Sequence, residues 1–179
     1  VPHRDDDTKK AWFIRPFFIW IMEEPKTLNS VAEFHKTFKH PILETPQIPT
    51  PDRCKLRVSL IAEELKELEE AIADNDLVEV ADALADIQYV LSGAILEFGL
   101  GNKFKSLFDE VQRSNMSKTC KSMEEAEATR KHYMDKDGTE SYIEESDGHF
   151  LVYRLEDKKT LKSVNYSPAD LKSILADDI

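Results

Sequence analysis

The stretch from Arg53 to Phe98, RCKLRVSLIAEELKELEEAIADNDLVEVADALADIQYVLSGAILEF, decides the fold of this 179-residue chain. Apolar residues recur at helical spacing on both sides of Asp74-Asn75-Asp76, a tripeptide typical of a turn. Gly99 follows as a residue suited to ending a helix. The stretch therefore predicts two helices joined by a tight turn. Their apolar stripes, which we expect to pack together, are Ile61, Leu65, Leu68 and Ile72 in the first helix and Val80, Leu84, Ile87, Leu91 and Phe98 in the second.

Acidic side chains gather beside both stripes. A charge run of this kind is ordinarily a solvated face, but no lysine or arginine occurs from Glu67 to Asn102 to pair with these acids. Carboxylates crowded at the edge of a buried face repel one another unless something neutralises them. A divalent cation would do so, and an all-oxygen ligand set favours Mg²⁺ or Mn²⁺ over zinc. The acids that share one side of the helical wheel are Glu63, Glu64 and Glu67, then Glu79, Asp82 and Asp86.

The spacing of these acids narrows the class of site. A ferritin-like di-iron bundle requires Glu-x-x-His on its helices, and the two predicted helices contain no histidine. The pattern Glu63-Glu64-x-x-Glu67 followed by Glu79-x-x-Asp82, together with DALADIQYV, resembles the EExxE…ExxD signature of the all-α nucleoside triphosphate pyrophosphohydrolases. That superfamily includes MazG-like proteins, dimeric dUTPases and phosphoribosyl-ATP pyrophosphohydrolases. The resemblance extends over about residues 31–175.

The resemblance implies a Mg²⁺-dependent hydrolase, with Mn²⁺ as an alternative ion, that cleaves a nucleoside triphosphate to the monophosphate and pyrophosphate. On this interpretation Glu64, Glu67, Glu79 and Asp82 are metal ligands, and Asp86 is a further ligand or a group that supports them. Glu63 lies beside them on the helical wheel and is the expected catalytic base, since the charge of its neighbours would raise its pKa.

Two later segments extend the resemblance. The first is Arg113–Lys118, RSNMSK, and the second is Lys162–Leu171, KSVNYSPADL. Basic residues are common at helix C-termini, and a tyrosine can simply anchor a tail, so each segment also has an ordinary structural interpretation. The resemblance implies that both line the nucleotide pocket, with Asn115 and Lys118 from the first segment and Lys162, Asn165 and Tyr166 from the second.

Composition limits the other classes of function. The net charge of −11 argues against a nucleic-acid groove or an anionic membrane surface. This net charge does not argue against a nucleotide ligand, because Mg²⁺ would bind the phosphates and neutralise their charge. Cys54 and Cys120 lack metal-site spacing and indicate two reduced thiols in a cytoplasmic protein. The apolar run 11–22 is too short to span a bilayer, and it lacks the cleavage site of a signal peptide. We therefore hypothesise that the family-like protein begins at Met22.

The remaining pattern predicts a mainly α protein, a MazG-like bundle of four to five helices with a small C-terminal antiparallel β-ribbon. An opening helix capped by Asn29 or Ser30, a fourth helix over 104–114 with Leu107, Phe108 and Val111 in the core, and a helix begun by Ser122 are expected. The ribbon follows from residue 141, and Ser167 with Pro168 predicts the start of a final helix. The predicted parts are an N-terminal extension (1–24), the all-α core (25–121) and a C-terminal helix, ribbon and short helix (122–179).

Two other functions stay open at this point. One is a catalytically silent helical protein that dimerises through its apolar stripes and binds a structural cation. The other is a phosphoribosyl-ATP pyrophosphohydrolase, which the long C-terminal extension makes less favoured than a triphosphate substrate. A homodimer or tetramer is expected in each case, because two helix pairs leave more apolar surface than one small chain can cover.

Overall fold

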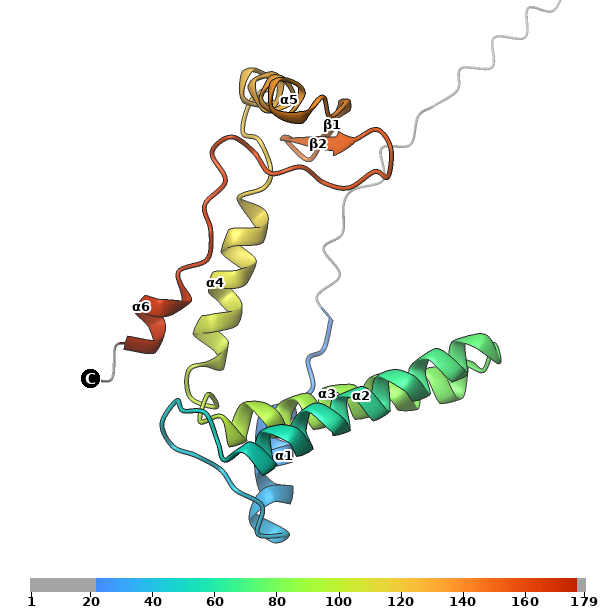
Figure 1. The fold of residues 1–179 in the computed structure, drawn as a ribbon, viewed down its shortest axis with the longest axis vertical. Coiled ribbons are helices and arrows are strands. Elements are labelled where there is room, and N and C mark those ends of the chain that lie inside the picture. Colours follow the sequence, from blue (N-terminus) through green and yellow to red (C-terminus); the bar gives the residue numbers. More distant parts are fainter. Residues whose placement is uncertain (1–21, 177–179) are drawn as a thin grey trace, which may run out of the picture.

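The computed structural model describes residues 22–176, so most of the expected N-terminal extension, residues 1–21, lies outside the described part. The protein is mainly helical with a two-stranded antiparallel sheet, as the sequence predicted (Figure 1). None of the described helices is long and apolar enough to cross a membrane. In chain order the elements are α1 (Thr27–Thr37), α2 (Pro51–Ala73), α3 (Leu77–Glu97), α4 (Phe104–Met116), α5 (Met123–Asp137), β1 (Ser141–Ser146), β2 (His149–Arg154) and α6 (Leu171–Ala176).

Helices α2 and α3 form the predicted antiparallel hairpin. Asn75 takes a positive φ of 53° in the turn, and the Asp76 carboxylate accepts hydrogen bonds from the first free N–H groups of α3. Helix α3 ends at Glu97, and at Gly99 just beyond it φ is 69° and a Cβ would lie 1.9 Å from the carbonyl oxygen of Thr45. Only glycine fits there. Helix α1 packs against α3 and begins at Thr27, so the predicted caps, Asn29 and Ser30, lie inside it.

The apolar stripes are only partly covered within one chain. Alternate stripe residues remain exposed because one helix contacts another along a narrow strip, and no other described element lies over the outer side of the hairpin. Leu107 of α4 is buried, but the prediction of Phe108 and Val111 as core is wrong for the single chain. The exposed fractions are 50% for Leu65, 62% for Ile72, 52% for Leu84, 39% for Leu91, 61% for Phe108 and 39% for Val111.

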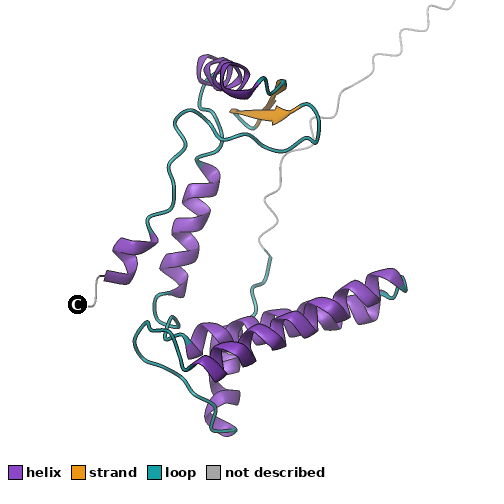
Figure 2. Cartoon of the chain, viewed as in Figure 1, coloured by secondary structure: helices purple, strands orange, loops and turns teal. Residues whose placement is uncertain are grey.

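Helix α5 and strands β1 and β2 form a separate small unit beyond the end of α4 (Figure 2). The Ser122 side chain caps α5 as predicted, accepting a hydrogen bond from the Glu125 N–H at 3.2 Å. Asp147 and Gly148 both take positive φ, 50° and 76°, which suits a two-residue hairpin turn. The unit has its own buried cluster, formed by Cys120, Ala126, Val152 and Leu161.

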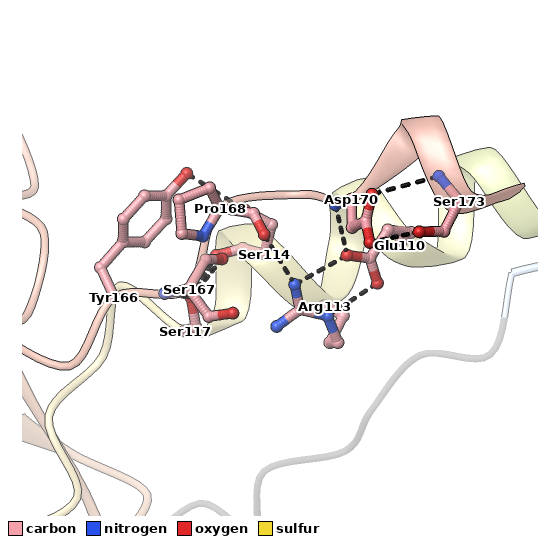
Figure 3. Close-up of polar contacts among 9 residues, drawn as sticks. All are labelled: Glu110, Arg113, Ser114, Ser117, Tyr166, Ser167, Pro168, Asp170 and Ser173. Carbon is pink, nitrogen blue, oxygen red and sulfur yellow. Dashed lines mark hydrogen bonds and ion pairs between the residues drawn. The ribbon is translucent and has the colours of Figure 1, made fainter. Parts of the chain in front are cut away.

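After this unit the chain returns and runs along α4 (Figure 3). The Tyr166 hydroxyl lies 3.1 Å from the Ser114 hydroxyl, and Ser167 N–H donates to Ser117 at 3.0 Å. The predicted helix start at Ser167 and Pro168 is wrong, because that segment is held extended against α4. Helix α6 begins at Leu171, and Asp170 caps it by accepting the Ser173 N–H at 3.2 Å.

Candidate active site

Glu64 of α2 and Asp86 of α3 occupy corresponding places in the hairpin. Each lies eleven residues from Asn75, one before it and one after. Because the two helices run antiparallel from the turn at Asn75, this spacing places them side by side along the shared groove. The hairpin therefore brings acids from both halves of the predicted signature to one stretch of its length.

Glu64 has the most unusual environment of these acids. Its side chain is half-buried, and the Oε2 atom is shielded from solvent with no hydrogen-bond partner. Burial raises the pKa of the Glu64 carboxyl, and the charges of Glu67, Asp86, Glu63 and Asp82 raise that pKa further. A shielded, unpaired carboxylate oxygen surrounded by other acids is the arrangement that a bound cation would stabilise.

The other predicted ligands are less enclosed than Glu64. Glu63, Glu67, Asp82 and Asp86 are exposed but near enough to act on the charge of Glu64. Glu79 lies in the first turn of α3 and is not among the acids that raise the Glu64 pKa. Within residues 22–176, no three His, Cys, Asp or Glu side chains are arranged closely enough to hold a metal ion. The donors are all hard oxygens and fit Mg²⁺ or Mn²⁺ in chemistry.

A cavity of about 240 Å³ opens one helical turn away from this pair. Its wall includes Leu60, one turn before Glu64, and Tyr89, just under one turn after Asp86. The Phe34 ring meets Tyr89 edge-on, with centroids 5.7 Å apart, and stacks on His40 at 5.7 Å. The cavity thus offers aromatic surface to a flat ring beside the acids.

A buried ionic cluster supports the far wall of this cavity. Glu97 is 1% exposed and binds two cations, Arg53 through Nε and Nη2 and Arg57 through Nη2. Burial opposes ionisation of Glu97, but the hydrogen bonds from both arginines outweigh it and lower the pKa of that carboxyl. Gly93 leaves room for the cluster, since a Cβ there would lie 2.7 Å from Arg57 Nη1.

His35 completes the cluster as a neutral side chain. Its Nδ1 lies 2.9 Å from the Pro41 carbonyl oxygen, which can only accept, so Nδ1 carries the proton. Nε2 is then free to accept from Arg57 Nη2 at 3.4 Å. Burial and the Arg57 charge lower the pKa of His35 below its ordinary value, although the hydrogen bond to Pro41 opposes them.

The sequence pattern did not assign this cluster to the site. The signal was present: Arg57 and Glu97 each interrupt an otherwise apolar stretch, where a charged residue is buried only if paired. The partners of Glu97 lie 40 and 44 residues away, however. No local spacing rule connects them.

The lowered His35 pKa predicts a pH dependence of stability. The unfolded chain takes up a proton on His35 near pH 6.5, the ordinary value, whereas the folded protein resists protonation. The free energy of unfolding should therefore fall as pH drops below about 6.5. Urea unfolding between pH 7.5 and 5 should show a shallower loss in His35→Gln, while His132→Gln, at an exposed position, should keep the wild-type slope. An equal dependence of the unfolding free energy on pH in all three proteins would contradict the assignment of His35 as neutral in the folded protein.

The predicted nucleotide-binding residues gather at the other end of α4. Lys118 Nζ donates to the Asn115 side-chain oxygen at 2.8 Å, and Lys162 Nζ lies 4.3 Å from the centroid of the Tyr166 ring. Asn165 lies beside them and lines a separate cavity of about 360 Å³. The structure thus joins the two predicted segments to each other, but not to the acids of the hairpin.

Comparisons with known proteins bear on the hairpin. Residues 31–115 match the model of the family described as phosphoribosyl-ATP pyrophosphohydrolase, which belongs to the MazG-like all-α NTP pyrophosphohydrolase superfamily. An uncharacterized protein of Acanthamoeba polyphaga mimivirus is 34% identical over 100 residues, 54% of this chain and 40% of that protein. The match thus spans less than half the length of this relative.

The matched residues contain most of α1, all of α2 and α3 and nearly all of α4, and with them every acid of the predicted signature. Pyrophosphohydrolases of this superfamily act on nucleotides and are generally metal-dependent. The superfamily predicted from the acidic pattern is confirmed. Over residues 31–115, this chain is similar to the MazG-like all-α NTP pyrophosphohydrolase superfamily.

Proposed function

We propose that this protein is a Mg²⁺- or Mn²⁺-dependent pyrophosphohydrolase that cleaves a nucleoside triphosphate to the monophosphate and pyrophosphate. The observation that carries the proposal is Glu64, whose Oε2 is shielded and unpaired and whose carboxyl lies within the charges of Glu67, Asp86, Glu63 and Asp82. The family match on residues 31–115 supports a nucleotide as the substrate.

Each acid has a role in this proposal. Glu64, Glu67, Glu79 and Asp82 hold the cation, and Asp86 acts as a further ligand or orients the others. When bound, the cation neutralises phosphate oxygens and aligns the chain for in-line attack. Glu63, exposed beside these acids, accepts the proton of the attacking water. The aromatic cavity beside Glu64 and Asp86 accommodates the base of the nucleotide.

A pyrophosphate-release assay tests this function. A panel of ribo- and deoxyribonucleoside triphosphates and phosphoribosyl-ATP would be assayed with Mg²⁺, with Mn²⁺ and with chelator. We expect release of pyrophosphate, dependent on the cation, from a triphosphate. Turnover of phosphoribosyl-ATP alone would transfer the proposal to that substrate, after which the matched family is named. No release from any substrate would leave the silent dimerisation protein as the better account.

We also propose that the protein is a homodimer. Exposed apolar residues lie on α2, α3 and α4, and isolated side chains of this kind would be normal, but here they form rows at helical spacing. Phe108 is 61% exposed, on the same face of α4 as Val111. A second copy supplies the matching rows, since a two-fold interface uses the same surface from both partners.

Phe108→Glu is expected to separate the dimer. A buried aromatic residue at an interface commonly contributes 2 kcal/mol or more, so the dissociation constant should rise by about 30-fold or more. Sedimentation velocity across a concentration series measures it. Ser106→Glu adds the same charge at an exposed position on the opposite face of α4 and should leave the dimer intact. A wild-type protein that stays monomeric at high micromolar concentration would contradict the dimer.

A further inference from the structure

Three rings, which we call the aromatic wall, line the cavity beside the hairpin acids: Phe34, His40 and Tyr89. All three are exposed, Phe34 by 37% and Tyr89 by 39%. Exposed side chains change rotamer within nanoseconds unless their neighbours hold them. A wall that presents one fixed surface to a flat ligand therefore needs support from buried groups.

His35 is the buried group beside two of these rings. It follows Phe34 in α1, it is only 2% exposed, and its ring centroid lies 5.5 Å from that of His40. Its Nδ1 donates to the Pro41 carbonyl oxygen at 2.9 Å, and its own carbonyl accepts the His40 N–H at 2.8 Å. The backbone before and after His40 is thus tied to a single buried residue.

The turn that carries His40 is strained. Lys39 takes a φ of 59°, a left-handed conformation that glycine adopts freely and that costs a lysine energy. The next N–H, that of His40, bonds to the carbonyl of His35, as in the Schellman motif that ends many helices. A lysine at the usual glycine position persists where the surroundings fix the conformation. The His35 side chain supplies such a constraint, because it holds the Pro41 carbonyl.

The buried ionic cluster fixes the other edge of the His35 ring. Nε2 accepts from Arg57 Nη2 at 3.4 Å, and Glu97 binds that guanidinium in turn. The contact is closely packed, because a Cβ at Gly93 would lie 2.7 Å from Arg57 Nη1 and 3.1 Å from His35 Nε2. A neutral imidazole donates at one nitrogen and accepts at the other, so His35 links the hairpin to the turn that carries His40.

We infer that His35 is a positioning residue for substrate binding, which fixes the His40 ring, and with it the stack on Phe34, against the base of the nucleotide. This inference rests on the proposed function, in which the cavity accommodates the base. The base occupies the cavity in the ground state and in the transition state alike, so a displaced wall weakens binding without slowing the step at phosphorus. Loss of the His35 contacts should therefore raise KM and leave kcat unchanged.

Two substitutions of His35 separate its two contacts. Asparagine places an amide N–H where Nδ1 donates to Pro41, but it does not reach Arg57. Glutamine reaches Arg57 with an amide oxygen in place of Nε2, but it loses the hydrogen bond to Pro41. His35→Gln should raise KM by about fivefold, the effect of one lost hydrogen bond, and His35→Asn should recover most of that loss. His132→Gln, at an exposed position of α5, is the control and should keep the wild-type KM.

The outcomes separate this inference from the proposed function. An unchanged KM in His35→Gln, or an equal rise in both His35 variants, would overturn the inference while the proposed function stands. A fall in kcat at unchanged KM would indicate that His35 only keeps the protein folded, and it would overturn the inference too. A wild-type protein that releases no pyrophosphate would instead refute the proposed function.

Nuclear magnetic resonance of the full chain tests the same contacts without turnover. In the wild type, His35 should carry its proton on Nδ1 and none on Nε2. The His40 ring protons should show cross-relaxation with the Phe34 ring that is lost in His35→Gln and kept in His35→Asn. A proton on Nε2 of His35, or the same ring contact in both variants, would overturn the inference whatever the activity of the protein.

Discussion

Glu64→Gln is expected to lower cation-dependent pyrophosphate release by about 100-fold or more. The carboxylate charge holds the cation, whose contribution to the reaction is several kcal/mol, and about 1.4 kcal/mol corresponds to a tenfold change in rate. Glutamine keeps the size of the side chain and an oxygen ligand but removes the charge. The measurement is kcat/KM at saturating Mg²⁺ on the triphosphate that the wild-type protein prefers.

This variant should fold at least as well as the wild type. The pKa of Glu64 is raised in the folded protein, by burial and by the neighbouring acids, so its ionised form costs stability above its ordinary pKa. Removing the charge therefore leaves the melting temperature unchanged or higher. Glu69→Gln is the matched control, since Glu69 is exposed on the same helix and has no role in the site. Activity of Glu64→Gln within threefold of that control would refute the assignment.

Glu97→Ala is expected to destabilise the fold by about 3–5 kcal/mol, the usual cost of removing one partner of a buried ion pair. Glu97 neutralises both Arg53 and Arg57, and the Arg57 side chain is 8% exposed. Without the carboxylate, two guanidinium groups and His35 would remain together at the base of α1. That loss is a large part of the 5–15 kcal/mol that holds most domains folded.

Urea unfolding at pH 7.5 measures this effect. Glu70→Ala is the comparison, because Glu70 is 62% exposed and pairs with Lys66 on the surface of α2. Surface pairs of that kind contribute about 1 kcal/mol or less. Two variants of equal stability would show that the buried cluster does not hold α1 to the hairpin. A low pH should weaken the wild type as well, since a lowered Glu97 pKa stabilises the fold only while the group stays ionised.

The hairpin could be predicted from the sequence because its signals are local. Asp76 is a cap next to the helix it begins, and Gly99 sits where the chain must take a positive φ. The shared side of the acids could then be predicted as well, since helical spacing fixes the side of a helix on which a residue lies. The same holds for the two-strand ribbon, whose turn residues Asp147 and Gly148 match the conformation they adopt.

Features that depend on distant partners could not be predicted in this way. The pairing of Glu97 with both arginines requires α2 and α3 to be packed together first, since the arginines lie on α2 and Glu97 on α3. The spacing of Phe108 predicts a core position, but the burial of a helix face depends on which element covers it and not on the pattern of its residues. The segment at Ser167 is extended and not helical as predicted, because Ser114 of α4 and Ser117 just after that helix hydrogen-bond with Tyr166 and Ser167.

Anomalous diffraction from crystals of the full chain with Mn²⁺ and a non-hydrolysable α,β-substituted triphosphate tests the central claim most directly. The account predicts a manganese peak in the groove between α2 and α3, within bonding distance of the Glu64 carboxylate and a phosphate oxygen. A peak that appears only outside this groove, or a nucleotide bound with no manganese near Glu64, would contradict it.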